Sequence, residues 1–458
     1  MTNYDIVINQ AHVMDPESGL DQLQNVGISQ GKIAVISDSP LQGEQVIDAP
    51  GQILCPGFID LHCHPQDTQI FEVQALDGVT TTLELEVGTS DIDHFYSKWE
   101  NQSPINFGAS IGHIPVRMKV MNDPGIFLPS GDAGRKLASN PEIVKMQHLI
   151  REGLEKGALA VGFGLDYTRG ASRWEVIQMF KVAAEFAASC HVHLRGKGHL
   201  EPSNAIEALE EVIAATAITG APLHVVHLNS TGMRAVPQLL DMISGANQSG
   251  LDVTTECYPY TAGMTKIESA LFDDGWQENY GIDYEQLMRP DTGEYLTAKT
   301  FSEYRESGGW IITFSTPEES MRAAVKSPLT MIATDSIIED GKGHPRTAGS
   351  YTKVLGEHVR ENGDLDLMSA LSKMTIMPAK RLQDRAPAFL NKGRIKQGAD
   401  ADIVVFDPLT VKDQSTYTNP IKPPIGLNHV IVNGVPVVSN SKLEEGAFPG
   451  KGIRAKIK

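Results

Sequence analysis

From residue 56 the chain reads Pro56-Gly57-Phe58-Ile59-Asp60-Leu61-His62-Cys63-His64, an apolar run that ends in a His-x-His pair. Successive side chains of a β-strand point to opposite faces, so His62 and His64 point the same way and Cys63 points the other way. Two neighbouring imidazoles at the end of a buried strand can chelate a divalent metal, most often zinc. A bare His-x-His is more often an ordinary polar strand end, so a metal site requires further ligands elsewhere in the chain.

The length and charge of the chain restrict its class. Its 458 residues, 41% hydrophobic and 21% charged, indicate an ordinary globular protein with one large domain and an appendage, or with two to three domains. The formal net charge of -18 and the pI of about 5.2 argue against nucleic acid and anionic membrane as partners.

The cysteines and the start of the chain indicate a cytoplasmic protein. Four cysteines, with no Cys-x-x-Cys pair, lie in or beside apolar runs, which predicts buried free thiols in a reducing cytosol. The first residues lack the basic start and apolar core of a signal peptide. We also expect no membrane span, because the sequence has no apolar run of about 18 residues.

From residue 56 onward, apolar strand-like runs alternate with helical segments. Residues 141–157, 172–188 and 202–219 show the apolar spacing of helices, and Ser139 is placed to cap the first of them. With the strand at residue 56, the strands number eight or nine, enough to close a parallel (β/α)8 barrel, an α/β fold of the TIM type. The other predicted strands are 78–87, 106–112, 158–163, 190–194, 223–228, 253–258, 310–314 and 329–334.

The two ends of the chain have a different pattern. Short β-rich runs precede residue 56, and such runs return after about residue 390 without helices between them. We therefore expect a small β-sandwich from residues 1–55 and 391–458, and a barrel domain at residues 56–390. Residues 261–309 are long for one connection and rich in Gly, Asp, Glu and Tyr, so we interpret them as an insertion over the barrel mouth.

The second predicted strand carries two carboxylates on one face. Glu84 and Glu86 alternate with apolar residues, and apolar residues that face the helices leave both carboxylates pointing into the barrel. Buried charges must be paired or bound to a metal. Glu86, nearer the carboxyl end of the strand, is the expected ligand, and Glu84 is the second candidate or supports it. The alternative is an edge strand with a solvated carboxylate face.

Further residues of the metal-binding type end three later strands. His193 shares a face with His191 in the run at 190–195, His227 follows the strand at 223, and Asp335 follows the strand at 329. Side chains at the carboxyl ends of barrel strands converge on one mouth, where catalysis takes place. A single such histidine is more often a core residue, but the repetition favours a metal site, with Asp335 in the position of a general base.

Taken in order, these residues resemble the amidohydrolase superfamily. The resemblance rests on the His-x-His after Pro-Gly-Phe-Ile-Asp, single histidines at strands five and six, and Asp335 at strand eight. It covers essentially the whole chain, and it implies a metal-dependent (β/α)8 barrel with a small β-sandwich formed from both termini. Within the superfamily the chain looks like the D-aminoacylase, or N-acyl-D-amino-acid deacylase, group, as stretches at 77–81, 192–195, 258–263, 332–335, 344–346 and 354–356 indicate.

The resemblance implies a set of ligands for one or two divalent ions per chain, with zinc as the expected metal. His62, His64 and Asp335 would hold the first subsite, and His193 and His227 would hold the second. Relatives bridge the subsites with a carbamylated lysine on strand four or a cysteine after the second strand. This chain has no lysine at 158–163 and no cysteine at 86–88, so Glu86 or Glu84 is the natural substitute.

The resemblance also implies how the substrate is held. Tyr258 matches a family tyrosine that donates to the scissile carbonyl, with Tyr260 as the alternative. The family lysine that pairs with a substrate carboxylate is replaced by Asn229, which can only hydrogen-bond. Because arginine binds carboxylates well, the candidates to compensate are Arg346, Arg195 and Lys197.

These residues imply a metal-dependent hydrolase of C–N amide bonds other than peptide bonds. The favoured interpretation is an N-acyl-D-amino-acid deacylase-like enzyme that acts on a small molecule. A cyclic-amide hydrolase of the dihydroorotase or hydantoinase kind is the alternative, and the missing lysine on strand four counts against it. A non-catalytic scaffold on the same fold is a third interpretation, against which the complete set of His and Asp positions counts. Metal identity and substrate detail stay open, and a homo-oligomer is compatible with the sequence.

Overall fold

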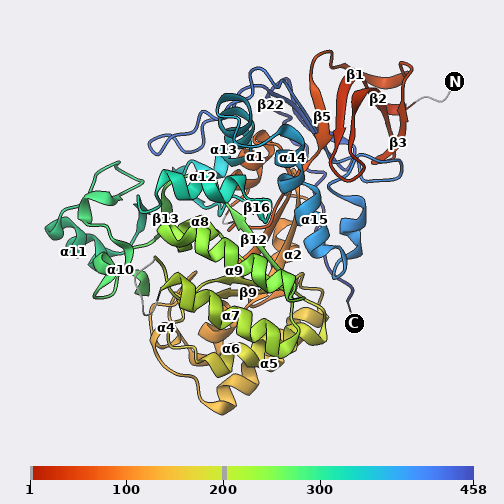
Figure 1. Cartoon of the computed structure of the whole chain (residues 1–458). Helices are drawn as coiled ribbons and strands as arrows, with labels where there is room; N and C mark the ends of the chain where they lie inside the picture. Colours follow the sequence, from red (N-terminus) through yellow and green to blue (C-terminus); the bar gives the residue numbers. More distant parts are fainter. Residues whose placement is uncertain (1–3, 66, 199–203, 458) are drawn as a thin grey trace.

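The computed structural model describes residues 4–65, 67–198 and 204–457, and a barrel of eight parallel strands lies at its centre (Figure 1). The barrel closes through Ser336, whose N–H donates to the carbonyl of His62 at 3.3 Å and whose carbonyl accepts from the N–H of His64 at 2.8 Å. The predicted (β/α)8 barrel is therefore confirmed. In order around the barrel, its strands are β6 (Phe58–Asp60), β7 (Val79–Thr89), β8 (Asn106–Gly112), β9 (Val161–Gly164), β10 (Cys190–His193), β11 (Leu223–Val225), β12 (Val253–Cys257) and β16 (Thr330–Ile332).

Helices follow the barrel strands along the chain. Helix α5 (Asn140–Glu155) begins after Ser139, whose backbone N–H donates to Glu142 at 2.7 Å. Helix α6 (Arg173–Glu185) follows Ser172, and Asn204 caps α7 (Ala205–Thr219). The first two residues of the segment predicted for α7 lie outside the described residues. Further helices are α1 (Gln69–Leu76), α2 (Ile92–Trp99), α3 (His113–Met121), α4 (Asp132–Arg135), α8 (Leu228–Gly232), α9 (Val236–Gln248), α12 (Glu318–Lys326), α13 (Arg346–Lys353), α14 (Leu367–Met374) and α15 (Ile376–Gln383).

The main hydrophobic core lies between the barrel strands and these helices. Phe163 on β9 packs there with Phe180 on α6, the ring centroids 5.2 Å apart. All four cysteines are buried free thiols, as the sequence predicts. Apolar side chains on the outer faces of the strands leave the polar side chains of the same strands to the barrel interior.

Strands from both ends of the chain form one nine-stranded sheet in the order β22-β21-β20-β19-β5-β1-β2-β3, with β4 paired to β1. Figure 1 shows the red N-terminal strands beside blue C-terminal segments. The sheet has a core of its own, which includes Ile8, Val26 and Ile403. We propose the domain boundaries predicted above, near residues 55 and 391. The strands are β1 (Tyr4–Asp15), β2 (Leu20–Ser29), β3 (Lys32–Ser37), β4 (Gly43–Asp48), β5 (Ile53–Pro56), β19 (Ile403–Phe406), β20 (Leu427–Val432), β21 (Val435–Ser439) and β22 (Lys442–Leu443).

A small lobe follows β12, at the left of Figure 1. It contains an antiparallel sheet of β13 (Gly263–Lys266), β15 (Trp310–Thr313) and β14 (Leu287–Met288), together with α10 (Trp276–Tyr280) and α11 (Ala298–Ser307). The prediction of a barrel strand at residues 310–314 was wrong, because β15 pairs with β13 and β14. A short apolar run predicts a strand without indicating the sheet to which it belongs.

A short hairpin of β17 (Ile338–Glu339) and β18 (Lys342–Gly343) follows β16. Along the chain it lies between Asp335 and α13, and Ile338 and Glu339 line a cavity together with Trp310.

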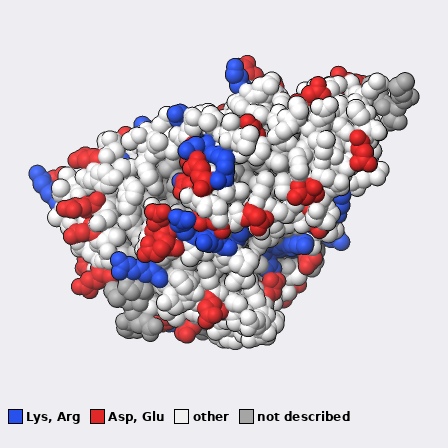
Figure 2. Space-filling view, turned by 45° about the horizontal axis from the view of Figure 1, so that its top comes forward, with Lys and Arg blue, Asp and Glu red and all other residues white. Residues whose placement is uncertain are grey.

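The charge of the molecule is not gathered in one patch on the face shown in Figure 2. Acidic side chains are spread over this face, and Lys and Arg side chains lie between them. Among the described residues, no helix is both long and apolar enough to cross a membrane.

Candidate metal centre

Glu86 lies in the middle of a buried group of histidines. Its Oε2 lies 2.7 Å from Nε2 of His62 and 3.2 Å from Nε2 of His64. Its Oε1 lies 2.7 Å from Nδ1 of His193 and 3.8 Å from Nε2 of His227. Glu86 comes from β7, and each of its two oxygens faces a different pair of histidines. The carboxylate is therefore shaped and placed to be shared between two subsites.

Two groups of candidate ligands meet at this carboxylate. In each group, one donor atom per residue lies within 4.8 Å of the others. Asp335 belongs to the first group, since its Oδ1 lies 3.4 Å from Nε2 of both His62 and His64. Imidazole nitrogens and carboxylate oxygens are donors that suit zinc and related divalent ions. The groups are His62, His64, Glu86 and Asp335, and Glu86, His193 and His227.

Two of these candidate ligands have left-handed backbones. The φ angle is 33° at His227 and 51° at Asp335. Side chains other than glycine seldom adopt this conformation, and such strain gathers at functional sites. Both residues lie just beyond the carboxyl ends of β11 and β16, at the edge of the barrel where active sites are found.

Two further carboxylates hold the outer nitrogens of the first histidine pair. Glu84 Oε2 lies 2.7 Å from Nδ1 of His64, and Glu256 Oε1 lies 2.6 Å from Nδ1 of His62. A carboxylate that accepts from Nδ1 fixes the tautomer and turns Nε2 toward the metal position. The geometry thus supports Glu86 as the ligand and gives Glu84 the supporting position.

Glu256 on β12 was missed by the sequence analysis. It is 1% exposed, and its second oxygen accepts from Nε2 of His224 at 2.9 Å. The signal that could have identified it was present, because Glu256 is a carboxylate near the carboxyl end of an apolar barrel strand, as Asp335 is.

Burial and charge act in opposite directions on the ionisable groups. Burial raises the pKa of Glu256, but the neighbouring charge of His62 and hydrogen bonds outweigh this and lower the pKa to about 2. Burial likewise raises the pKa of Asp335, but Arg346 and the histidines hold that pKa below its ordinary value. Burial lowers the pKa of His227 to about 4. Burial also lowers the pKa of His62 and His64, but the neighbouring carboxylates outweigh this and raise both pKa values, so a divalent ion bound here would displace protons from these two rings.

Arg346 is a predicted substrate-binding residue that lies at this centre. It is 1% exposed, and its Nη2 lies 2.9 Å from Oδ2 of Asp335. Its Nε and Nη1 have no hydrogen-bond partner among the described residues. Together with His64 and Glu86 it lines a small cavity. Unpaired guanidinium donors in a buried cavity suit an anionic group of a substrate.

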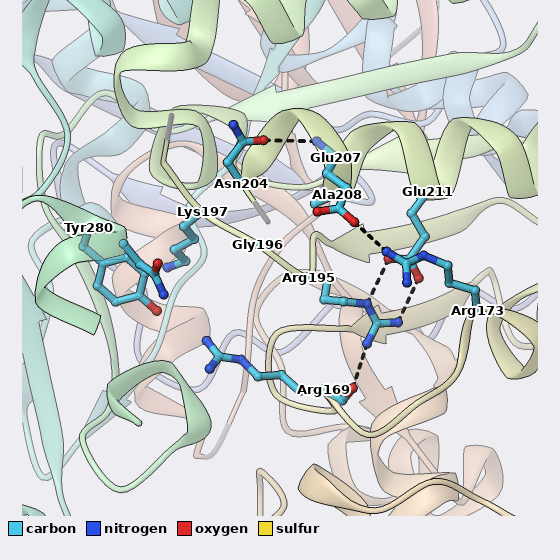
Figure 3. A pocket seen from close by; sticks show the side chains of 11 residues that line it. Arg169, Arg173, Arg195, Gly196, Lys197, Asn204, Glu207, Ala208, Glu211 and Tyr280 are labelled. Carbon is cyan, nitrogen blue, oxygen red and sulfur yellow. Dashed lines mark hydrogen bonds and ion pairs between the residues drawn. The ribbon is translucent and has the colours of Figure 1, made fainter. Parts of the chain in front are cut away.

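Asn229 and Arg195 were also predicted to bind substrate, but their contacts lie elsewhere. The amide of Asn229 donates to the carbonyls of Tyr258 and Tyr260 at 3.0 and 3.3 Å, so it holds the turn that carries Tyr258. Arg195 donates to Glu211 at 2.8 and 2.9 Å, in a surface pocket that Lys197 also lines (Figure 3). These contacts argue against a direct role for Arg195.

Tyr258 follows β12 and is 1% exposed. Its hydroxyl has no hydrogen-bond partner among the residues that the structure describes, and the Arg346 guanidinium lies 4.7 Å from its ring centroid. Burial raises the pKa of Tyr258 to about 12, so the hydroxyl keeps its proton and can donate it in a hydrogen bond. Tyr260, the predicted alternative, already donates to the carbonyl of Pro345 at 3.4 Å. The geometry thus favours Tyr258.

Comparison with known proteins confirms the resemblance predicted from the sequence. The model of the amidohydrolase family matches residues 144–438. The chain is 29% identical to an N-acyl-D-glutamate deacylase of Alcaligenes xylosoxydans xylosoxydans, over 94% of this chain and 93% of that protein. It is 25% identical to a D-aminoacylase of the same organism, over 98% and 96% of the two chains.

A solved structure with a similar fold is that of N-acyl-D-glutamate deacylase from Bordetella bronchiseptica, complexed with zinc and a phosphonate inhibitor that mimics the tetrahedral intermediate. The TM-score is 0.85 at 25% sequence identity, and the match covers 99% of this chain and 100% of that one.

Proposed function

Because the chain belongs to the amidohydrolase family and is a hydrolase of C–N amide bonds other than peptide bonds, we propose that it is a metal-dependent deacylase of N-acyl-D-amino acids. The observation that carries the proposal is the position of Glu86 between two histidine pairs, next to Asp335. Hydrolysis adds water across the amide bond and releases a carboxylate and a free D-amino acid.

The donor set fits a divalent metal, and we propose zinc. His62, His64, Glu86 and Asp335 would hold one ion, and Glu86, His193 and His227 would hold a second. The nitrogen and oxygen donors are typical of zinc, and a zinc-containing relative of similar fold supports this choice. A divalent ion bound here would supply Lewis acidity, which acidifies water and polarises a carbonyl.

Asp335 is the proposed proton carrier. One of its oxygens faces the histidines, and the other lies 2.9 Å from Arg346. From this position it takes a proton from the attacking water and passes it to the leaving amine. The contact with Arg346 keeps the carboxylate charged and fixes its direction.

Tyr258 and Arg346 are proposed to bind the substrate, Tyr258 at the carbonyl oxygen and Arg346 at the α-carboxylate. The unpaired hydroxyl of Tyr258 donates to the oxygen on which negative charge develops. The guanidinium of Arg346 binds the α-carboxylate with its unpaired nitrogens. Because the guanidinium stacks on the tyrosine ring, the two groups are held beside each other.

We also propose a cytoplasmic location, which the four buried free thiols support, since such thiols persist in reducing compartments.

The test is release of free amine from N-acetyl-D-amino acids by the purified, zinc-loaded protein. The matched L-enantiomers, dihydroorotate and hydantoins serve as controls. We expect turnover of the D-substrates and little turnover of the controls. Turnover of ring substrates alone would make the protein a cyclic-amide hydrolase. Bound zinc without turnover of any of these compounds would contradict the proposal.

A further inference from the structure

A second cavity adjoins the cavity at the candidate ligands, and we call it the vestibule. It is lined by Asp67, the loop at 124–130, residues 266 and 268–269, Trp310 and residues 338–340. Phe127, Leu128 and Trp310 line both cavities. A substrate bound at the candidate ligands would therefore extend past these three side chains into the vestibule.

The wall of the vestibule nearest the candidate ligands is apolar. The ring of Phe127 lies 5.3 Å from that of His64 and 6.3 Å from that of Trp310, measured between centroids. Ile126, beside it in the loop, is fully exposed. Ile126, Phe127, Leu128 and Trp310 thus line the cavity together, and apolar side chains grouped at a cavity are typical of a binding surface.

The loop that carries Ile126 and Phe127 is held in shape by Asp123. The carboxylate of Asp123 accepts hydrogen bonds of 2.9 to 3.0 Å from four backbone N–H groups. These groups belong to Gly125, Ser130, Gly131 and Ala133. A loop fixed in this way presents its apolar side chains without a large ordering cost on binding.

The rest of the vestibule is acidic. Its lining includes four carboxylates and a single ammonium group, that of Lys266. The Nζ of Lys266 lies 3.5 Å from Oε2 of Glu339 and 4.1 Å from the centroid of Trp310, so this cation and Glu339 offset each other and three lining carboxylates remain. A negative group of a substrate would meet like charges here, and the interaction would be unfavourable. The carboxylates are Asp67, Glu268, Glu339 and Asp340.

We infer that the enzyme selects N-acyl-D-amino acids that place an apolar, uncharged group in the vestibule, and that it disfavours substrates with a second carboxylate there. The inference rests on the proposed deacylase function. The apolar group can belong to the amino-acid side chain or to the acyl chain, because both can carry the same chemistry.

Two pairs of substrates distinguish these sources. The side-chain pair is N-acetyl-D-leucine and N-acetyl-D-glutamate, and the acyl pair is N-butyryl-D-alanine and N-succinyl-D-alanine. For the zinc-loaded enzyme we expect kcat/KM to favour the apolar member by about tenfold or more in at least one pair. The pair that shows this preference identifies whether the amino-acid side chain or the acyl chain occupies the vestibule. Equal or greater kcat/KM for the acidic member in both pairs would overturn the inference, whereas no turnover of any of the four would overturn the proposed function itself.

Charge variants test the cause of the preference. Ile126→Lys adds a cation at an exposed position, and Asp340→Asn removes a carboxylate at a backbone φ of 51°, which asparagine tolerates. Each should raise kcat/KM of the acidic member relative to its apolar partner by about fivefold. Asp241→Asn, exposed on α9, is the matched control and should leave the ratio unchanged. A ratio that neither vestibule variant moves would contradict the charge argument.

Discussion

Glu256 Oε1 lies 2.6 Å from Nδ1 of His62, while Oε2 of Glu86 lies 2.7 Å from Nε2 of the same ring. The imidazole is thus held between a supporting carboxylate from β12 and a candidate ligand from β7. A side chain from a strand only two places from β6 in the closed barrel therefore positions a candidate ligand of the His-x-His pair.

Replacing Glu256 by glutamine should weaken metal binding without removing the ligands. Loss of the charged acceptor at Nδ1 of His62 is expected to lower zinc affinity about 10- to 100-fold. Competition with a zinc chelator measures this change. Glu211→Gln, which touches Arg195 away from the centre, is the control. An unchanged affinity in Glu256→Gln would show that the carboxylate does not support the ligand.

Asp335→Asn should keep the fold and bound zinc but lose most turnover. Asparagine accepts the positive φ of this position and keeps one oxygen, but it cannot carry a proton. We expect kcat to fall roughly 10²- to 10⁴-fold. Steady-state kinetics with a parallel measurement of bound metal checks this. Near wild-type kcat at full zinc occupancy would remove Asp335 from the proton transfer.

Tyr258→Phe should lower kcat about 10²- to 10³-fold with little change in KM, because only a donor to the developing oxyanion is lost. The phenyl ring still packs against Arg346. Tyr260→Phe serves as the comparison, since that hydroxyl donates to the carbonyl of Pro345. Equal losses in the two variants would mean that neither hydroxyl has the catalytic role.

Arg346→Met and Arg195→Met should differ in their effect on KM. Loss of Arg346 removes the partner of the substrate carboxylate, and we expect KM for N-acetyl-D-amino acids to rise at least about tenfold. Loss of Arg195 breaks a contact with Glu211 at the surface pocket in Figure 3, and it should change KM less than about twofold. The reverse order of effects would restore Arg195 as the substrate-binding arginine.

Much of the centre could be predicted because its signals are local. The spacing of His62 and His64 puts both on one face, the alternation in β7 turns Glu84 and Glu86 inward, and Asp335 ends an apolar run. Barrel geometry then brings strand ends together whatever their separation in the sequence. The (β/α)8 fold could also be predicted, because strands and helices alternate repeatedly along the sequence.

The remaining features depend on tertiary contacts that local patterns do not encode. Whether Trp310 begins a barrel strand or a strand of the lobe is decided by its pairing partners, not by its apolar character. Asn229 and Arg195 have the right chemistry for a substrate, but their donors are used by a backbone turn and by Glu211. The vestibule could not be predicted either, because the loop around Ile126 has no periodic pattern.

The most direct measurement is a zinc titration of the metal-free protein in which bound zinc and release of D-amino acid are followed together, in wild type, Glu86→Gln and Glu84→Gln. We expect activity to rise with bound zinc in wild type. Glu86→Gln should lose both zinc and activity, whereas Glu84→Gln should bind zinc more weakly but recover activity at high zinc. Activity that is independent of zinc, or full zinc binding and turnover in Glu86→Gln, would contradict a metal centre built on Glu86.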